Sequence, residues 1–280
     1  PGGAPAGAAR RRGIAPHGMR GDIMSLKPDY PAVPIFGLPF SKMDMAETVA
    51  YLARAIEARR PTQVITGNPI MVMAALERPD YYRVMEQAEL IVPDGAGIVW
   101  ASRLAGDPMP ERVAGFDLLH ELMREGERRR WSVYLLGARQ DVVEEVARRL
   151  QEHYPLVRIA GFRNGYFGPE EDAGVVAAIR EAAPDLLFVA RDALTTQEPW
   201  IARHKHELGA AVMMGVGGSF DVIAGRTKRA PVFFQKLGLE WLYRLLRQPS
   251  RAGRMAALPR FVLKVLRAGR KIAERPDTAR

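Results

Sequence analysis

Short β-rich runs alternate with longer helix-periodic stretches between residues 34 and 225, and this alternation limits the fold more than any other feature of the chain. The candidate strands are TQVIT (62–66), ELIVP (89–93), SVYLLG (132–137), VRIAGF (157–162), DLLFVA (185–190) and AAVMMGVGG (210–218). Helical stretches flank them at residues 46–59, 68–79, 114–129, 141–154, 171–183 and 197–208. Strands that alternate with helices are typical of a mostly parallel sheet with helices on both faces. We therefore predict a Rossmann-like α/β domain over residues 33–225.

Polar or glycine-rich turns follow four of these strands. They are Thr66-Gly67-Asn68-Pro69, Asp94-Gly95-Ala96-Gly97, Gly137-Ala138-Arg139 and Gly217-Gly218-Ser219, with Asp221 just inside the next helix. The carboxyl ends of parallel strands meet at one edge of a sheet, where backbone N–H groups and helix N-termini can bind phosphate. Each glycine alone is more often explained by turn geometry. Together, these turns indicate a ligand of the nucleotide type.

The stretch LIVPDGAG (90–97) leaves two readings open for its one carboxylate, Asp94. Asp-Gly is a common turn pair, because Asp tolerates the opening position of a turn and Gly adopts positive φ without steric cost. Local evidence therefore favours a turn residue, and a reactive carboxylate is the alternative. Thr66 leaves a similar choice between a substrate contact and the N-cap of the following helix.

Common cofactor and metal signatures are absent from the sequence. The turns at Gly67 and Gly95 do not complete G-x-G-x-x-G, and neither a P-loop nor an Asp-x-Asp pair occurs. The chain has no cysteine, and its histidines lack metal-cage spacing. We expect no cofactor and no metal, and a reducing compartment such as the cytoplasm. A departing diphosphate would then be stabilised by arginines, lysines and helix dipoles.

The first 32 residues are rich in Gly, Ala, Pro and Arg and lack the apolar core of a signal peptide. We expect residues 1–32 to be a disordered leader. The longest apolar runs, such as LLFVA and AAVMMGVGG, are shorter than the ~20 residues needed to cross a bilayer. The sequence therefore predicts no membrane span.

Positive charge is concentrated in the tail. Residues 226–280 contain 15 Lys and Arg against 3 acids, a net charge of +12, whereas the whole chain is +9 and the remainder is −3. Residues 258–272 have the pattern of a basic amphipathic helix, with Arg260, Lys264, Arg267 and Lys271 opposite Phe261, Val262, Val265 and Ile272. Such a helix either lies in an anionic membrane interface or packs on the domain with its basic face in water. We treat residues 226–280 as a separate appendage.

Several motifs in a fixed order resemble the WecG/TagA/CpsF family. They are T-G-N-P (66–69), P-D-G-x-G-x-V-W (93–100), P-x-P-E-R-V-A-G-x-D-L (108–118), Y-L-L-G (134–137), G-Y-F (165–167), Q-E-x-W-I (197–201), G-V-G-G-x-F-D (215–221) and G-x-x-K-R-A-P followed by L-G-L-E-W-L-Y-R-L (225–245). The resemblance implies an inverting, metal-independent, Rossmann-like glycosyltransferase of family 26. Such enzymes transfer a sugar, best known as N-acetylmannosamine, from a UDP-sugar to a sugar on undecaprenyl diphosphate. Teichoic acid or another surface polysaccharide is the expected product.

The resemblance also implies roles for particular residues. Asp94 is the expected general base, and Thr66 is expected to hydrogen-bond the sugar or the carboxylate. We expect substrate contacts from Asn68, Gly95, Arg112, Gly137, Gln197, Glu198, Gly217, Gly218, Asp221 and the tail residues Arg244, Arg247 and Arg251. Arg254 continues that tail series, and one or more of the four arginines is expected to neutralise the leaving UDP. The expected partners are a UDP-sugar, a lipid-linked acceptor and an anionic membrane surface on the cytoplasmic side, with a homo-oligomer possible.

One turn departs from the family pattern. The family usually has a glycine-containing turn with Pro-Lys before the Gln-Glu pair, whereas residues 191–196 read R-D-A-L-T-T and are one residue longer. The loss of the glycine and the lysine changes the expected diphosphate contacts. Arg191 can replace the missing positive charge, or the donor can be handled differently.

Other functions remain as alternatives. The same fold and mechanism can use another donor such as UDP-glucose. A nucleic-acid-binding α/β protein would use the basic tail on phosphates and would bind in a salt-sensitive way. A dehydrogenase would bind NAD. Because the ordered motifs favour the transferase, we expect no nucleic-acid partner.

Overall fold

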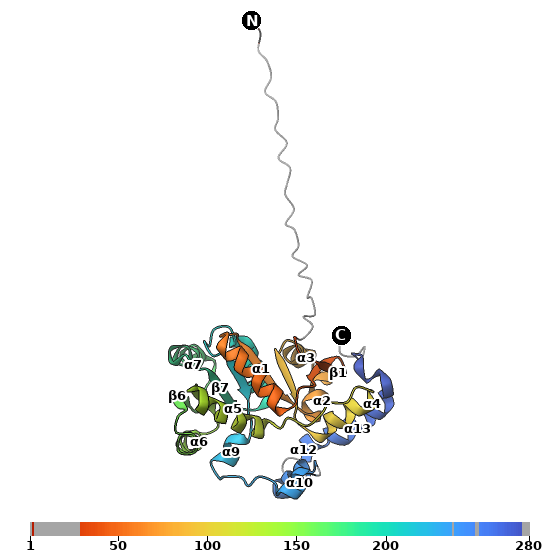
Figure 1. Cartoon of the computed structure of the whole chain (residues 1–280). Helices are drawn as coiled ribbons and strands as arrows, with labels where there is room; N and C mark the ends of the chain where they lie inside the picture. The colour runs from red at the N-terminus through yellow and green to blue at the C-terminus, as the bar shows by residue number, and fades with distance from the viewer. Residues whose placement is uncertain (1, 3–28, 237, 250–251, 276–280) are drawn as a thin grey trace.

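Within the described residues, eight strands form one sheet in the order β1-β2-β4-β3-β8-β7-β5-β6 (Figure 1). The computed structural model describes residues 2, 29–236, 238–249 and 252–275. The expected leader therefore lies almost entirely outside the described residues, and so does Arg251. Six strands run parallel to their neighbours and match the six that the sequence predicts, to within a few residues: β3 (Thr62–Gly67), β4 (Leu90–Pro93), β5 (Ser132–Gly137), β6 (Arg158–Arg163), β7 (Leu186–Ala190) and β8 (Val212–Gly215).

An antiparallel hairpin that the sequence analysis missed forms the other edge of the sheet. Its strands β1 (Ala32–Ile35) and β2 (Leu38–Ser41) are joined at Phe36 and Gly37, which both have positive φ. Each strand has only four residues and contains a proline, so neither shows a strand pattern. Pro34 is tolerated because β1 is an edge strand with no further partner to hydrogen-bond, and Pro39 of β2 lies opposite it in the hairpin register. β2 pairs with β4 and so joins the hairpin to the parallel strands.

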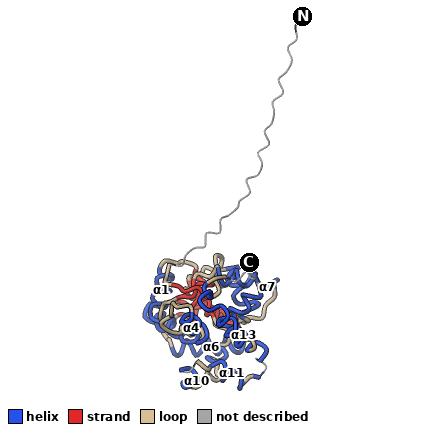
Figure 2. The backbone as a smooth tube through the Cα atoms, turned by 90° about the vertical axis from the view of Figure 1, so that its right-hand side faces the viewer, coloured by secondary structure: helices blue, strands red, loops and turns tan. Residues whose placement is uncertain are grey.

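Helices cover both faces of the sheet, as predicted (Figure 2). One face packs on α1 (Met45–Glu57), α5 (Gly115–Arg129), α6 (Gln140–His153) and α9 (Ser219–Ile223). The other face packs on α2 (Pro69–Glu77), α3 (Pro79–Glu86), α4 (Ala96–Leu104), α7 (Pro169–Ala182) and α8 (Glu198–His204). Val64 points to the first face and Ile65 to the second, because successive side chains of a strand alternate. The predicted Rossmann-like α/β fold is confirmed.

Two helices and one irregular turn were not expected from the sequence. α3 follows α2 after the extended residue Arg78 and begins at Pro79, and α4 follows the Asp94-Gly95 turn. The segment Ala193–Gln197 before α8 is a π-helix, capped by the side chain of Asp192. A π turn accommodates an additional residue in a helix. It lies in the turn that is one residue longer than the family pattern.

The described part of the tail forms the helices α10 (Val232–Lys236), α11 (Glu240–Arg247), α12 (Ala252–Met255) and α13 (Ala257–Ala268), followed by a 3-10 turn, η3 (Gly269–Ala273). α10 and α11 lie at one end of the molecule, away from the sheet (Figures 1 and 2). α13 packs on α2, and the N–H of Phe36 donates to the carbonyl of Ile272 at 2.6 Å. The chain thus returns to the hairpin at which its fold begins. In the described part of the chain, no helix has the length and apolar character needed to cross a bilayer.

Of the two arrangements that the sequence leaves open for the basic amphipathic helix, the structure shows the one in which it packs on the domain. Phe261, Val265 and Ile272 are buried against α2, α4 and the hairpin, and do not form a free membrane-facing surface. The apolar face packs on the domain because these three residues complete an apolar cluster with α2 and the hairpin. Val262 remains exposed, together with Leu263 and Leu266 on the outer side of α13.

We expect Phe261→Ala to lower the free energy of unfolding by about 3–5 kcal/mol, the usual range for deleting a buried phenyl ring. The Phe261 side chain is 1% exposed and meets the Phe36 ring edge-on at 6.3 Å. Urea unfolding followed by circular dichroism measures the change. Leu266→Ala, on the exposed side of the same helix, is the matched control and should stay within about 0.5 kcal/mol of the parent. Equal effects of the two changes would mean that α13 does not contribute to the core.

Candidate active site

A cavity of about 1820 Å³ opens at the carboxyl edge of the parallel strands. Its walls contain most of the residues that the sequence analysis singled out: Thr66, Asn68, Asp94, Gly95, Arg112, Gln197, Glu198, Gly217, Gly218 and Asp221. The appendage supplies another wall through α11, α12 and α13. Most small-ligand pockets measure roughly 300–1,000 Å³. The cavity therefore has room for more than one substrate.

Asp94 is held at the end of β4 by two backbone groups. Its N–H donates to the carbonyl of Gly67 at 2.8 Å, which ties the end of β4 to the end of β3. Its Oδ2 accepts from the N–H of Gly115, the first residue of α5, at 3.2 Å. Gly95 follows with φ of 152°, as the turn chemistry of Asp-Gly predicts. The turn reading of LIVPDGAG is correct for the glycine, and the same geometry fixes the carboxylate in the cavity wall.

Thr66 lies against the N-terminus of α5, next to the Asp94 contact. A Cβ at Gly115 would lie 2.8 Å from Cγ2 of Thr66 and 3.2 Å from its Oγ1, so only glycine lets α5 approach this closely. Thr66 does not cap α2. The cap is Asn68, whose Oδ1 accepts from the N–H groups of Ile70 and Met71 at 3.0 and 3.1 Å. The N-cap reading of Thr66 is therefore wrong, and Asn68 has a structural task beside any substrate contact.

A buried chain of polar side chains joins β3 to the turns after β7 and β8. The Gln197 Oε1 accepts from the N–H groups of Arg191 and Gly217, at 3.2 and 3.1 Å, and so links the turns after β7 and β8. Its Nε2 donates to Glu198 at 2.7 Å, and Glu198 also accepts from Gln63 of β3 at 3.2 Å. Gln197 is thus locked in one orientation. Its placement indicates that it shapes the cavity wall through two backbone turns.

Glu198 is completely buried. Burial raises the pKa of its carboxyl to about 7, while the hydrogen bonds from Gln197 and Gln63 lower it. A Cβ at Gly215 would overlap both Gln197 and Glu198. The glycine that opens the G-V-G-G motif therefore makes room for this pair. Gly217 and Gly218, in contrast, have open space where a Cβ would lie, which leaves their backbone accessible from the cavity.

Gly137 serves packing rather than lining the cavity. Its φ is 121°, and a Cβ there would overlap the backbone of Ala190 at the end of β7. Ala138, the next residue, does line the cavity and donates to the carbonyl of Ala190 at 2.8 Å. The turn after β6 adds Gly165 and the exposed Tyr166 to the same wall. The motif G-Y-F (165–167) is part of the family resemblance, but the sequence does not predict that this segment faces the cavity.

Ion pairs connect the appendage to the core across the cavity. Arg112 donates to Glu240 of α11 at 2.7 Å, and the Arg229 guanidinium lies 3.7 Å from the same carboxylate. Arg229 also makes two hydrogen bonds with Asp117 of α5, at 2.8 and 2.7 Å. Arg254 of α12 pairs with Asp192 at 2.6 Å. Arg229, Glu240 and Asp192 were missed in the sequence, because no local pattern links residues so far apart in the chain.

Of the other tail arginines that the sequence analysis singled out, the structure describes the side chain of Arg247 but not those of Arg244 and Arg251. Arg247 lies with its guanidinium 5.6 Å from the Tyr243 ring centre and does not line the cavity. The side chain of Arg244 lies outside the described residues, like the whole of Arg251. Their expected contacts with a diphosphate remain predictions.

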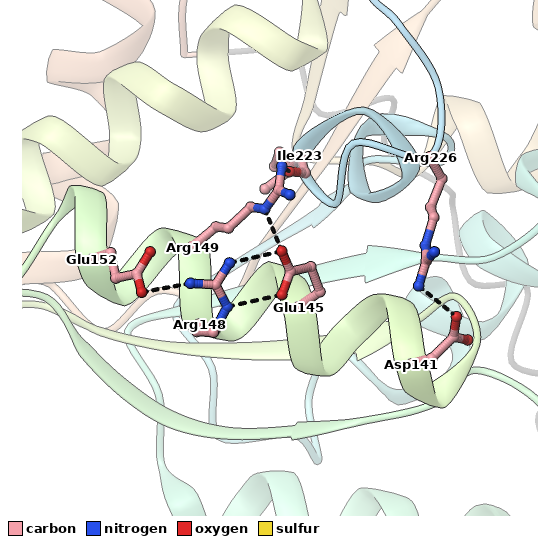
Figure 3. A network of polar contacts seen from close by, with 7 residues as sticks. All are labelled: Asp141, Glu145, Arg148, Arg149, Glu152, Ile223 and Arg226. Carbon is pink, nitrogen blue, oxygen red and sulfur yellow. Dashed lines mark hydrogen bonds and ion pairs between the residues drawn. The ribbon is translucent and has the colours of Figure 1, made fainter.

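The start of the appendage is fixed to α6 by a charged network (Figure 3). Arg226 donates to Asp141 at 3.0 Å, and Arg149 donates to the carbonyl of Ile223 at 2.9 Å. Glu145 accepts from both Arg148 and Arg149. These contacts hold the chain where it leaves α9 and turns towards the cavity.

Among the residues that the structure describes, no group of three or more His, Asp or Glu side chains has the geometry to hold a metal ion. In that part of the chain, carboxylates of the cavity wall do not cluster with one another. Asp94 instead contacts a backbone N–H group, Glu198 contacts amide side chains, and Glu240 and Asp192 pair with arginines. The chemistry that the described site supports is hydrogen bonding, proton transfer and charge pairing with an anionic ligand.

Comparisons with known proteins found a matching family and several relatives. Residues 33–275 match the model of the glycosyl transferase WecG/TagA/CpsF family. The chain is 36% identical, over 86% of its length and 93% of the relative, to the N-acetylglucosaminyldiphosphoundecaprenol N-acetyl-beta-D-mannosaminyltransferase of Bacillus spizizenii. It is 36% identical to the enzyme of that name from Bacillus subtilis, over 83% of this chain and 90% of the relative. The identity to the Staphylococcus aureus enzyme of that name is 37%, over 86% and 94%.

Glu198 should make the stability of the fold depend on pH. The pKa of Glu198 is raised in the folded state, so its own contribution to stability is fully present below the unfolded pKa of the carboxyl and is lost as pH rises through about 7. The total loss is of order 3 kcal/mol for this shift. We expect Glu198→Gln to remove that loss, so that the variant gains stability over the parent at pH 8 but not at pH 4.5. Urea unfolding at the two pH values measures the difference, and a constant difference between variant and parent would contradict the buried, proton-binding carboxyl.

Proposed function

The chain belongs to the WecG/TagA/CpsF glycosyltransferase family, and on that premise we propose that it transfers N-acetylmannosamine from a UDP-sugar to N-acetylglucosamine carried on undecaprenyl diphosphate. The observation that carries the proposal is the position of Asp94. Its carboxylate lies in the wall of a large cavity, beside Thr66, at the edge of the sheet where the phosphate-type turns converge. The names of the relatives supply the identities of donor and acceptor.

The proposed reaction is a single displacement at the anomeric carbon. Asp94 takes the proton from the acceptor hydroxyl as its oxygen attacks the anomeric carbon, and the bond from that carbon to the UDP oxygen breaks on the opposite side. The electron pair leaves with UDP, and the configuration is inverted. The contact from the N–H of Gly115 holds one carboxylate oxygen, which orients the carboxyl group towards the cavity. Thr66 lies within the same corner and can hydrogen-bond the sugar.

Two features support the assignment of donor and acceptor to the cavity. The turns after β3, β4 and β8 bring backbone N–H groups to one edge, which suits the phosphates of a nucleotide. The volume of about 1820 Å³ accommodates a nucleotide sugar and the sugar end of a second substrate together. The rest of the acceptor is a lipid, so the cavity mouth has to lie near a membrane.

The appendage has the surface expected for contact with a membrane. Seven of the eleven large hydrophobic side chains that are exposed among the described residues lie in it: Val232, Phe233, Trp241, Leu246, Val262, Leu263 and Leu266. They accompany the +12 net charge of residues 226–280. Apolar side chains that insert among lipids, next to cations that meet lipid phosphates, are the usual elements of a peripheral membrane surface. We propose that this surface, and not the buried face of α13, rests on the cytoplasmic membrane.

We expect Asp94→Asn to lower the rate of sugar transfer by about 100- to 10,000-fold, because the amide cannot accept the proton. The measurement is transfer from a panel of UDP-sugars, including UDP-N-acetylmannosamine and UDP-glucose, to a lipid-diphosphate-GlcNAc analogue. UDP binding should be retained, since the substitution leaves the shape of the side chain unchanged.

Asp107→Asn is the control for this experiment, because it removes a carboxylate outside the cavity that pairs with Lys42. It should transfer at the parental rate. Parental transfer by Asp94→Asn would refute the base assignment. A parent protein that transfers no sugar from any UDP donor, but binds nucleic acid tightly, would refute the proposed function as a whole.

A second prediction concerns the outer side of α13. The double substitution Leu263→Ser and Leu266→Ser should weaken binding to phosphatidylglycerol vesicles by about 10- to 30-fold, if each leucine contributes about 1 kcal/mol on insertion. Vesicle cosedimentation measures the affinity. The fold should be unaffected, since both side chains are exposed.

The matched control replaces two equally exposed hydrophobic residues outside the appendage, Leu156→Ser and Phe162→Ser. It should bind vesicles like the parent. If the control loses as much affinity as the α13 variant, the membrane surface has been placed on the wrong side of the molecule.

A further inference from the structure

Most arginines in the cavity wall already have a carboxylate partner. Among the described residues these pairs are Arg112 with Glu240, Arg139 and Arg226 with Asp141, Arg229 with Asp117, and Arg254 with Asp192. The carboxylates largely cancel the charges of Arg112, Arg229 and Arg254, whereas Arg139 and Arg226 share the one carboxylate of Asp141. An anionic substrate gains little from a cation that must first give up its partner.

Arg191 is the exception in the described part of the cavity wall. No carboxylate in the described chain lies within ion-pair distance of its guanidinium, which instead stacks over the Phe167 ring at 4.2 Å from the centroid. Partial burial lowers the pKa of Arg191, and the charge of Asp172 only partly offsets this effect. Asp172 is itself engaged, because it accepts from Trp200 at 2.5 Å and contacts the His204 ring at 3.0 Å. A partly buried cation without a counter-ion is costly unless a ligand supplies the anion.

Both the backbone and the guanidinium of Arg191 are held in place by neighbouring residues. Its backbone N–H donates to Gln197, the side chain that also holds the turn after β8. Its Cγ lies 3.1 Å from the position that a Cβ at Gly165 would take, so the glycine of G-Y-F spares the arginine stem a tight contact. The Phe167 ring then supports the guanidinium from one side. The guanidinium is therefore presented in a defined place rather than left mobile.

The sequence of this turn gives a reason for a cation at this position. Residues 191–196 lack the Pro-Lys of the family pattern, and the structure absorbs the longer turn in the π-helix Ala193–Gln197. The side chains at 195 and 196 are threonines, which carry no charge, and both hydrogen-bond to Asp192. Arg191 is the cation that this turn offers to the cavity.

We infer that the guanidinium of Arg191 binds a diphosphate group of the substrates, an inference that rests on the proposed sugar transfer. A planar guanidinium suits this role, since it can donate two parallel hydrogen bonds to phosphate oxygens. Two substrates carry such a group, the nucleotide donor and the lipid-linked acceptor. The turns after β5, β6 and β8 surround Arg191 and favour the diphosphate of the nucleotide.

The test compares Arg191→Gln and Arg191→Lys with the parent protein. Titration calorimetry with UDP should show about 10- to 100-fold weaker binding for Arg191→Gln, and a smaller loss for UMP, which lacks the second phosphate. Arg191→Lys should recover part of the UDP affinity, because it restores the charge without the fork. The acceptor arm measures KM for a soluble lipid-diphosphate-GlcNAc analogue. A raised acceptor KM with unchanged UDP binding would assign the same contact to the acceptor diphosphate.

Stability separates ligand binding from a structural role. Removing a cation that has no carboxylate partner should leave the urea midpoint of Arg191→Gln unchanged or higher, whereas a structural role predicts a lower one. Arg158→Gln, an exposed arginine on the edge strand β6, is the matched control for the loss of one charge and should bind UDP like the parent. Unchanged UDP binding and unchanged acceptor KM in Arg191→Gln would overturn the inference. A parent that binds UDP through Arg191 but transfers no sugar would instead refute the proposed function.

Discussion

The parallel direction of the central strands is the constraint on which the site depends. Because β3, β4, β5, β7 and β8 run the same way, their carboxyl ends finish at one edge, and residues from distant parts of the chain meet there. Thr66 and Asp94 become neighbours only through this arrangement, with Val92 of β4 in register with Thr66 of β3. The hairpin β1–β2 forms the lateral edge of the sheet beside β4, and none of its residues lines the cavity.

A buried polar chain then converts parallel strand ends into a shaped wall. Gln63, Glu198 and Gln197 connect β3 with the turns after β7 and β8, and Gly215 leaves the space they occupy. Buried polar groups are costly unless they are satisfied, so such a chain favours one arrangement over its alternatives. The residues that hold the wall are therefore as important to the cavity as the residues that face it.

The sequence predicts the elements that are formed by short buried apolar runs. It does not predict features that depend on contacts between residues far apart in the chain. The six parallel strands are predicted because each is a short apolar run, whereas the hairpin has four-residue strands with prolines and shows no such pattern. Thr66, Asp94 and Gly217 are predicted to lie near one another because their turns share a sheet edge, whereas Gln197 is indicated only by the family resemblance. The pairs of Arg112 with Glu240 and Arg254 with Asp192 could not be predicted, since they depend on how the appendage folds back. Helical periodicity in residues 258–272 identifies an apolar face but cannot tell whether lipid or α2 will cover it.

The return of the chain to its own beginning has a consequence for synthesis. The hydrogen bond between Phe36 and Ile272, and the burial of Phe261 beside the hairpin, join the two ends of the folded sequence. Contacts between such distant residues form late and slow folding, because the intervening chain must be ordered first. A nascent chain can complete its sheet while one wall of the cavity is still missing. Closure of the cavity therefore waits until residues 226–275 have been synthesised and α13 has packed against the hairpin, long after the strands that carry Thr66 and Asp94 have been made.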